Sequence, residues 1–405
     1  MNVVEINTYY QYGSTGMIVG DLETAMMESG ISPYILYGRD MYPPEASDHV
    51  YKINTSAGYL AHKWTTHLLG YQCLSSTGQT KKAIDILRHI RPDVVHLHNL
   101  HGHYLNIKIL FDYLRETQVP VVWTFHDCWP FTGHCAYFFN IGCDKWKTGC
   151  GNCPQKIAYP RSLFFDRSAE QWKIKQELYG SLPNLHIVTV SHWLESLVRE
   201  SFLSASDIRT IYNGVDTAIF YPRITHDDVR KKLDAGEKKI VLGVASGWTE
   251  RKGLSDFLYL AQKLPKDAEI VLVGKVPSGF RLPENILPYG CISDKNELAS
   301  LYSAADVFVN PSRQETFGLT TAEAMACGTP AVVYNVTACP EVVGDDLRCG
   351  DKVTPFDKQE LYEKTVQILQ QPTAGGKFPH EQVANMFDKG KQIGEYISLY
   401  NELYR

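Results

Sequence analysis

Short apolar runs alternate with amphipathic stretches along most of the 405-residue chain. The runs are rich in Val, Ile and Leu, and helical periodicity separates them, which is the pattern of a parallel sheet built from βαβ units. In the first half of the chain we expect strands at Val3–Asn7, Pro33–Tyr37, Asp93–His98, Val119–Phe125, 186–190 and 208–212. Helices are expected up to Met27 and over Thr80–Ile90, Leu105–Thr117, 168–179 and 192–201.

The alternation of strands and helices stops over residues 213–238. Here the turn-forming residues Asn213-Gly214-Val215-Asp216 precede a highly charged stretch. A domain boundary is therefore expected near 215–225. A second series follows, with strands at Lys239–Val244, Glu269–Val273, Asp306–Asn310 and Pro330–Tyr334 and helices near 254–263, 295–304, 320–326 and 358–370. The predicted domains are 1–215, with a Cys-rich insertion at about 127–165, and 216–378, followed by a helix over 379–405 that is able to pack back on the first domain.

Two α/β domains with doubly wound parallel sheets follow from this order. Such sheets bind ligands at the carboxyl ends of their strands, and two of them in tandem create a cleft. Functional residues should therefore lie in the loops that follow strands.

Composition narrows the class of protein. Apolar residues make up 44% and charged residues 21%, which excludes disordered and collagen-like classes, and the net charge of −5 argues against nucleic acid as a partner. No apolar run reaches the roughly 18 residues of a membrane span, and the first residues lack the basic and apolar regions of a signal peptide. We expect a cytoplasmic protein; a peripheral contact with the membrane stays open.

The most informative motif is Glu315-Thr-Phe-Gly-Leu-Thr-Thr-Ala-Glu323, at a strand-to-helix junction. The amino end of a helix attracts anions, so the amides here are suited to a diphosphate, and Gly318 lets it approach the backbone. Glu315 is a candidate acceptor for sugar hydroxyls and Glu323 for ribose hydroxyls. The alternatives are a solvated loop carboxylate at Glu315 and a capping box between Thr320 and Glu323.

A pair of cations follows the first strand of the second domain, in Gly247-Trp-Thr-Glu-Arg251-Lys252-Gly253. Arg251 and Lys252 are able to neutralise a leaving diphosphate without a divalent metal. The alternative is a solvated charged turn.

Two motifs of the first domain indicate a ligand-binding role less strongly. Gly13 and Gly16 in Tyr12–Gly16 would allow a ligand close to the backbone, or they form a plain βα turn. His126 ends a strand, where it can donate a hydrogen bond to a substrate or serve as a buried structural histidine. The nearby histidines are favoured as hydrogen-bonding groups over metal ligands: His96, His98, His101 and His103.

Four cysteines cluster in the insertion with the spacing C-x7-C-x6-C-x2-C: Cys135, Cys143, Cys150 and Cys153. The spacing fits a structural zinc site with four thiolate ligands, and free thiols and disulfides remain as alternatives.

The segment Glu315–Glu323, with Asn310-Pro311-Ser312 before it, resembles the E-x7-E element of glycosyltransferase family 4. Arg251-Lys252-Gly253 looks like the phosphate-binding pair of that family, and Asn213-Gly-Val-Asp216 looks like its interdomain segment. The stretch from His126 through Cys135 to Cys153 is similar to bacterial polysaccharide glycosyltransferases of the colanic-acid type.

The resemblance implies a GT-B fold and transfer of a sugar with retention at the anomeric carbon, with no cofactor required for catalysis. It implies that Arg251 and Lys252 hold the donor diphosphate with the amides of Gly318 and Leu319, that Glu315 contacts the sugar, and that Glu323 contacts the ribose. The base is expected near Ile292, and His126, Gly13 and Gly16 approach from the first domain. The expected catalytic residues are His126, Arg251, Lys252 and Glu315, and Gly247 and Phe317 complete the donor-binding set.

The predicted function is that of a retaining hexosyltransferase in cell-surface polysaccharide assembly, including exopolysaccharide. It would use a UDP- or GDP-linked sugar and a glycan or lipid-linked oligosaccharide acceptor in the cytoplasm, and a contact with the inner face of the cytoplasmic membrane stays open. The alternatives are a nucleotide-sugar epimerase or another enzyme on the same scaffold, and a non-catalytic sugar-binding relic.

Overall fold

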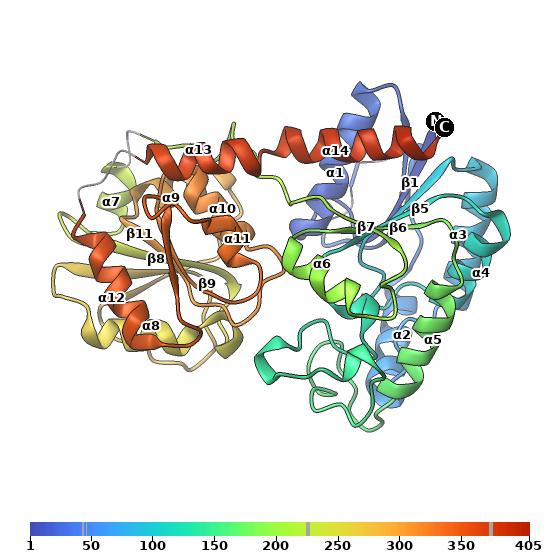
Figure 1. Cartoon of the computed structure of the whole chain (residues 1–405), viewed down its shortest axis with the longest axis horizontal. Coiled ribbons are helices and arrows are strands. Elements are labelled where there is room, and N and C mark those ends of the chain that lie inside the picture. The colour runs from blue at the N-terminus through green and yellow to red at the C-terminus, as the bar shows by residue number, and fades with distance from the viewer. Residues whose placement is uncertain (43, 46, 224–226, 372–375) are drawn as a thin grey trace. The chain divides into compact units, whose positions relative to one another are not determined.

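The computed structural model describes residues 1–42, 44–45, 47–223, 227–371 and 376–405. The chain forms two compact units. The first unit combines Met1–Ile211 with Ile393–Arg405, and the second contains Tyr212–Gln392. Each unit is an α/β domain with its own parallel sheet (Figure 1).

The first unit is built on a seven-stranded sheet in the order β3-β2-β1-β4-β5-β6-β7, with every pair of neighbours parallel. The strands are β1 Asn2–Tyr9, β2 Ser32–Arg39, β3 Val50–Lys52, β4 Val94–Leu97, β5 Val121–Phe125, β6 Leu185–Thr189 and β7 Asp207–Thr210. Its helices are α1 Gly13–Glu28, α2 Ser56–Leu69, α3 Thr77–Ile90, α4 Ile107–Thr117, α5 Ser168–Gly180 and α6 His192–Arg199.

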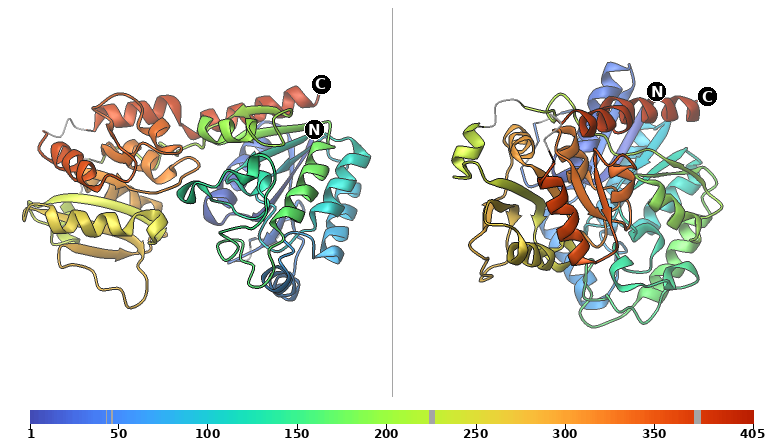
Figure 2. Two further views of the ribbon diagram at one scale, coloured as in Figure 1. Left: turned by 60° about the horizontal axis from the view of Figure 1, so that its bottom comes forward. Right: turned by 60° about the vertical axis from the view of Figure 1, so that its left-hand side comes forward.

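The second unit has a six-stranded parallel sheet in the order β10-β9-β8-β11-β12-β13. Its strands are β8 Lys239–Gly247, β9 Ala268–Lys275, β10 Ile286–Gly290, β11 Val307–Asn310, β12 Ala331–Tyr334 and β13 Gly350–Val353. Its helices are α7 Asp227–Lys232, α8 Leu254–Lys263, α9 Lys295–Ala304, α10 Leu319–Ala326, α11 Cys339–Val343, α12 Lys358–Leu369 and α13 Lys377–Met386, and α14 Lys389–Leu403 begins here and ends in the first unit. Figure 2 shows helices on both faces of the sheets.

The strand order explains where each unit can bind a ligand. In both sheets the first strand lies in the middle, the next two strands extend to one side, and the fourth strand lies on the other side. The order therefore reverses between β1 and β4 in the first unit and between β8 and β11 in the second. Loops that leave the carboxyl ends of such a pair diverge and open a crevice.

The C-terminal helix completes the core of the first unit. Tyr396, Leu399 and Tyr400 of α14 are buried together with residues of the central strands and of α1. Tyr396 and Tyr400 also bond to the sheet, because the Tyr400 hydroxyl lies 2.7 Å from Nδ1 of His96 and the Tyr396 hydroxyl lies 2.9 Å from Oγ1 of Thr124. The one helix expected over 379–405 is in fact two helices, and Phe387 and Asp388 separate them.

Several elements were not expected from the sequence. Strands β3, β10 and β13 are edge or near-edge strands that are short, or polar, or contain Pro and Gly, as edge strands often do. Helix α2 was also missed, because its buried side chains are His62 and Thr66 while several of its large apolar side chains face outward. The Cys-rich insertion at 127–165 contains three single 3-10 turns, at Trp129–Phe131, Phe139–Ile141 and Lys145–Lys147.

Candidate active site

The loops that follow β8 and β11 meet at the switch point of the second unit. The Lys252 ammonium forms a salt bridge with Oε1 of Glu315. Arg251 donates from Nη1 to the carbonyl oxygen of Gln314 at 3.1 Å, and its own carbonyl accepts from the amide of Arg313 at 2.8 Å. Both predicted cations are therefore fixed to the loop that carries Glu315.

Local backbone geometry explains the Arg-Lys-Gly sequence. The Thr249 side chain accepts from the amide of Lys252 and caps a single 3-10 turn over Glu250–Lys252. Gly253 follows with φ of +77°, and a Cβ there would lie 2.6 Å from the carbonyl oxygen of Pro311. Only glycine lets the turn after β8 pack this closely against the loop after β11.

The charge of Glu315 depends on this arrangement. Burial raises the pKa of its carboxyl group, but the charge and hydrogen bond of Lys252, together with the charge of Arg251, outweigh burial and hold the pKa below its usual value. Glu315 is therefore ionised at neutral pH. Its backbone is also fixed, since its amide donates to Oγ1 of Thr337 at 3.1 Å.

The helix that follows, α10, begins at Leu319, directly after Gly318. This glycine is the N-cap, with φ of +100°, and a Cβ there would lie 2.9 Å from Sγ of Cys339. The first amides of the helix have no partner within it, which makes this end a site for an anion. The capping box between Thr320 and Glu323 is wrong, because Thr320 lies inside the helix and its N-cap residue makes no side-chain cap bond.

Glu323 lies one turn into α10 and accepts from the hydroxyl of Tyr302 at 3.1 Å. Burial raises the pKa of its carboxyl group to about 7, against smaller lowering effects of Tyr302 and Lys295. Glu323 therefore changes charge near neutral pH, and a hydroxyl donor is already bound to one of its oxygens.

Three other residues of the predicted donor set occupy different positions in the second unit. Gly247 is the last residue of β8 and Ile292 lies in the loop after β10, so both are at the carboxyl edge of the sheet. The ring of Phe317 is buried instead against Phe387 and Tyr212, with centroid separations of 5.4 and 6.1 Å. Phe317 thus presents its backbone rather than its side chain to this edge.

The remaining predicted residues belong to the first unit. His126 follows β5, and its ring lies nearly parallel to that of His98, with Nε2 of His126 3.0 Å from Nδ1 of His98. Nε2 of His98 lies in turn 3.1 Å from Oε1 of Glu5, in the fully buried middle of β1. Burial lowers the pKa of His126 to about 4. The charge of Asp127 opposes this lowering, and the charge of His101 adds to it. His126 is therefore neutral at neutral pH, and its Nε2 is connected through His98 to Glu5.

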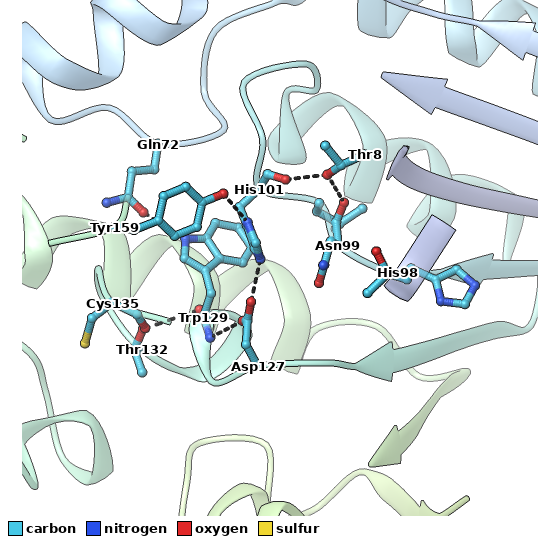
Figure 3. Close-up of polar contacts among 12 residues, drawn as sticks. Thr8, Gln72, His98, Asn99, His101, Asp127, Trp129, Thr132, Cys135 and Tyr159 are labelled. Carbon is cyan, nitrogen blue, oxygen red and sulfur yellow. Dashed lines mark hydrogen bonds and ion pairs between the residues drawn. The ribbon is translucent and has the colours of Figure 1, made fainter. Parts of the chain in front are cut away.

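Asp127, next to His126, organises the start of the insertion (Figure 3). Its Oδ2 lies 2.8 Å from Nε2 of His101, and its Oδ1 accepts from the amide of Trp129 at 2.8 Å. Nδ1 of His101 lies 2.8 Å from the hydroxyl of Tyr159, so a residue near the end of the insertion is tied to its start. Burial opposes ionisation of Asp127, but the charge and hydrogen bonds of His101 and Trp129 hold its pKa below the usual value.

Gly13 and Gly16 do not form a loop, because α1 begins at Gly13. Gly13 is exposed, with φ of +66° and open space around it. Gly16 is buried in the first turn, where a Cβ would lie 3.2 Å from the carbonyl oxygen of Tyr9. Gly16 therefore serves the packing of α1 on β1, and Gly13 is the one that leaves room for a ligand.

The four clustered cysteines line one small cavity of about 20 Å³: Cys135, Cys143, Cys150 and Cys153. Cys135 and Cys153 are hydrogen-bonded to each other, and the sulfur of Cys150 accepts from the amide of Gly133 at 3.2 Å. Within the described ranges of the chain, the three ligand atoms that come within 4.8 Å of one another belong instead to Glu5, His96 and His98. Both nitrogens of His96 and of His98 already have protein partners, as hydrogen-bonding groups do.

Sequence reasoning missed Glu5 and Tyr302. A carboxylate inside the apolar run Val3–Asn7 was the available signal for Glu5, since a buried acid needs a partner. Nothing in the sequence pairs Tyr302 with Glu323, which are brought together by the packing of α9 on α10.

Comparisons with known proteins agree with this architecture. A family model described as Glycosyltransferase Family 4 matches residues 16–219, and one described as Glycosyl transferases group 1 matches residues 238–371. WcaC of Escherichia coli K12, which is assigned as a colanic acid biosynthesis glycosyl transferase, is 26% identical over 422 residues, with 100% of both chains covered. An MMP alpha-(1→4)-mannosyltransferase of Mycolicibacterium hassiacum is 34% identical over 205 residues, which cover 45% of this chain and 47% of the other.

Solved glycosyltransferase structures have the same fold. Sucrose-phosphate synthase from Thermosynechococcus elongatus aligns with a TM-score of 0.71 at 21% identity, covering 100% of this chain and 99% of that one. HepE of Anabaena in complex with UDP-glucose aligns with a TM-score of 0.66 at 16% identity, covering 98% and 100%. The chain therefore belongs to glycosyltransferase family 4 and has the GT-B fold.

Proposed function

We propose that the protein is a retaining hexosyltransferase that uses a nucleotide-diphosphate sugar. The observation that carries this proposal is the convergence of Lys252, Arg251, Glu315 and the amino end of α10 at the β8–β11 switch point. In this proposal, the cations and the amides of Gly318 and Leu319 bind the diphosphate. Glu315 accepts from hydroxyls of the hexose, and Glu323 accepts from the ribose.

The chemistry follows from where negative charge develops. As the bond to the anomeric carbon breaks, charge accumulates on the leaving diphosphate, and fixed donors stabilise it without having to reorganise. Two cations and the helix amides supply that positive charge, so no cofactor is needed in this scheme. Retention follows if the acceptor hydroxyl attacks from the side of the leaving group and loses its proton to the departing phosphate.

We further propose a glycan or lipid-linked oligosaccharide acceptor, in the cytoplasm, during assembly of a cell-surface polysaccharide. The likeness to WcaC over its full length supports this acceptor class. Structures of HepE with UDP and UDP-glucose support UDP-sugars as the first donors to test, and GDP-sugars follow.

The test is incubation with a panel of UDP- and GDP-sugars, with and without a lipid-linked acceptor, followed by NMR of the product anomer. Transfer with the anomeric configuration of the donor is the expected result. An inverted product would refute retention, and interconversion of donors without acceptor would indicate an epimerase. Binding of the nucleotide sugar with no turnover on any acceptor would favour the non-catalytic alternative.

We also propose that the four clustered cysteines hold a structural zinc ion. They line one small cavity of about 20 Å³, and an amide already donates to one of the sulfurs, as amides do to metal-bound thiolates. Binding would draw the sulfurs inward and tie together an insertion that otherwise has three single turns.

Elemental analysis of the purified full chain tests the zinc proposal. One equivalent of zinc is expected, released by a mercurial reagent that blocks thiols. The variant Cys150→Ser should lose the metal, and Cys291→Ser, an exposed cysteine of the second unit, should keep it. Zinc well below one equivalent with four titratable thiols, or disulfides among these cysteines in the intact mass, would overturn the proposal.

A further inference from the structure

An unusual set of apolar side chains is exposed on one side of the first unit. Leu60, Trp64 and Leu68 recur every four residues on α2, so they form one stripe along that helix, and Trp64 is 55% exposed. Ile157, Phe164 and Phe165 are exposed at the end of the Cys-rich insertion, with Phe164 at 66%. We call these six residues the apolar patch.

Hydrogen bonds join the two parts of the apolar patch. The amide of Leu163 donates to the carbonyl oxygen of His67 at 2.7 Å, and Nε of Arg167 donates to the carbonyl oxygen of Leu69 at 2.7 Å. Gly70, which ends α2, lies so close to the carbonyl oxygen of Phe165 that a Cβ would be 3.1 Å from it. The segment 162–167 is therefore fixed beside the last turn of α2.

Basic residues predominate in the two segments that carry the apolar patch, but Asp166 directly follows Phe165 and Glu170 forms a salt bridge with Arg167 at 2.7 Å. The sequence contains no Asp or Glu from His49 to Ile84, and none from Pro154 to Phe165. The pKa of His67, on α2, is lowered by partial burial and by the positive charges of Lys63 and Arg161, so both charges act on this part of the surface. Lys156 belongs to the same group, since its ammonium donates to the carbonyl oxygen of Phe164 at 3.3 Å.

We propose that the apolar patch and these three basic residues dock the first unit on the surface of a membrane that contains anionic lipid. Exposed Trp, Phe and Leu side chains beside Lys and Arg are the composition of an interfacial helix that inserts only its apolar face. Basic groups near an anionic bilayer add attraction that falls off within a Debye length. Among the described residues, no helix is both long and apolar enough to cross a membrane.

The inference stands on exposure and charge, and it adds to the proposed function a reason why a lipid-linked acceptor would be reached. Its test uses the full chain with vesicles of phosphatidylcholine, with and without phosphatidylglycerol, in a co-flotation assay. Wild type should float with the anionic vesicles, bind neutral vesicles weakly, and be released by salt.

Two variants separate the apolar and the charged contributions. Leu60→Gln/Trp64→Gln should weaken binding at least about tenfold, and Lys63→Glu/Arg161→Glu should weaken binding to anionic vesicles by a similar factor. The matched controls are Leu347→Gln, an exposed leucine of the second unit, and Lys81→Glu, an exposed lysine on α3. Both controls should bind vesicles as wild type does.

Wild type that does not float with anionic vesicles, or patch variants that float like wild type, would overturn the proposal. A chain that is dimeric by light scattering and becomes monomeric in the apolar variant would assign the patch to self-association instead. UDP binding is measured without vesicles on every variant and should not change. Failure of docking is thus distinguishable from failure of the proposed activity.

Discussion

The salt bridge between Lys252 and Glu315 provides the sharpest test of the donor site. The substitution Lys252→Met keeps an unbranched side chain that is one atom shorter and removes its charge. Both side chains are largely buried, with exposed fractions of 20% for Lys252 and 17% for Glu315. Truncating one partner of a buried charge pair costs about 2–5 kcal/mol, and the remaining exposure argues for the lower end.

Nucleotide binding should suffer in addition. A charge-assisted hydrogen bond to a phosphate oxygen contributes about 1.5–3 kcal/mol, which corresponds to roughly 10- to 100-fold in Kd for UDP. Because charge on the diphosphate grows in the transition state, turnover of the nucleotide sugar should fall by more than the affinity does. Isothermal titration with UDP and initial rates on the nucleotide sugar measure the two effects.

Lys263→Met is the matched control, since it removes the same charge at the far end of α8, a ten-residue helix that is about 15 Å long. The double variant Lys252→Met/Glu315→Gln removes the unpaired carboxylate, so it should recover thermal stability but not UDP affinity. If Lys252→Met binds UDP within about twofold of wild type, Lys252 does not contact the diphosphate, and the electrostatic argument for this site fails.

Three further predictions follow from the two units. Gly318→Ala should lower both UDP affinity and melting temperature. A residue with a Cβ atom costs about 1–2 kcal/mol at this φ, and the Cβ would contact Sγ of Cys339. Unchanged UDP affinity and melting temperature would contradict this prediction. Glu323 is neutral below its pKa of about 7 and ionised above it, so UDP affinity should rise from pH 6 to pH 8, and Glu323→Gln should flatten that profile in titrations at ~pH 6 and ~pH 8. Burial raises the pKa of Glu5, so the stabilisation from its neutral form is complete below the unfolded-state pKa of ~4.3 and is lost as pH rises toward the folded-state value. Melting temperature should therefore decline as pH rises. Glu5→Gln keeps a donor toward His98 and should reduce this decline. Parallel curves of melting temperature against pH for wild type and variant would count against the prediction.

The central parts of both sheets could be predicted from the sequence, because their strands are continuous apolar runs. Val121–Phe125 and Ala331–Tyr334 are buried throughout, and burial on both faces leaves no polar alternation to confuse the pattern. Edge strands carry no such signal, as Ile286–Gly290 shows with a Pro and a Gly inside five residues. Helix α2 was missed for the opposite reason, because its apolar side chains serve a surface and not the core.

The candidate site was predictable where charged residues stand in a loop that directly follows a strand. Arg251, Lys252 and Glu315 could be named from spacing, and the structure brings them together within one unit. Their mutual contacts could not be predicted, since they depend on which strands are neighbours in the sheet. The same holds for Glu5, whose partner His98 lies 93 residues away and is adjacent only because β1 pairs with β4.

The last thirteen residues belong to the core of the first unit, and this has a consequence for biosynthesis. The first 211 residues emerge from the ribosome long before α14 is synthesised. Until then the first unit is incomplete, and His96 and Thr124 lack their tyrosine partners. The second unit, by contrast, is continuous in sequence and can fold as soon as it emerges. The first unit is thus the first to be synthesised and the last to complete its fold. Loss of a short C-terminal segment, through a premature stop codon or proteolysis, would therefore destabilise the N-terminal unit.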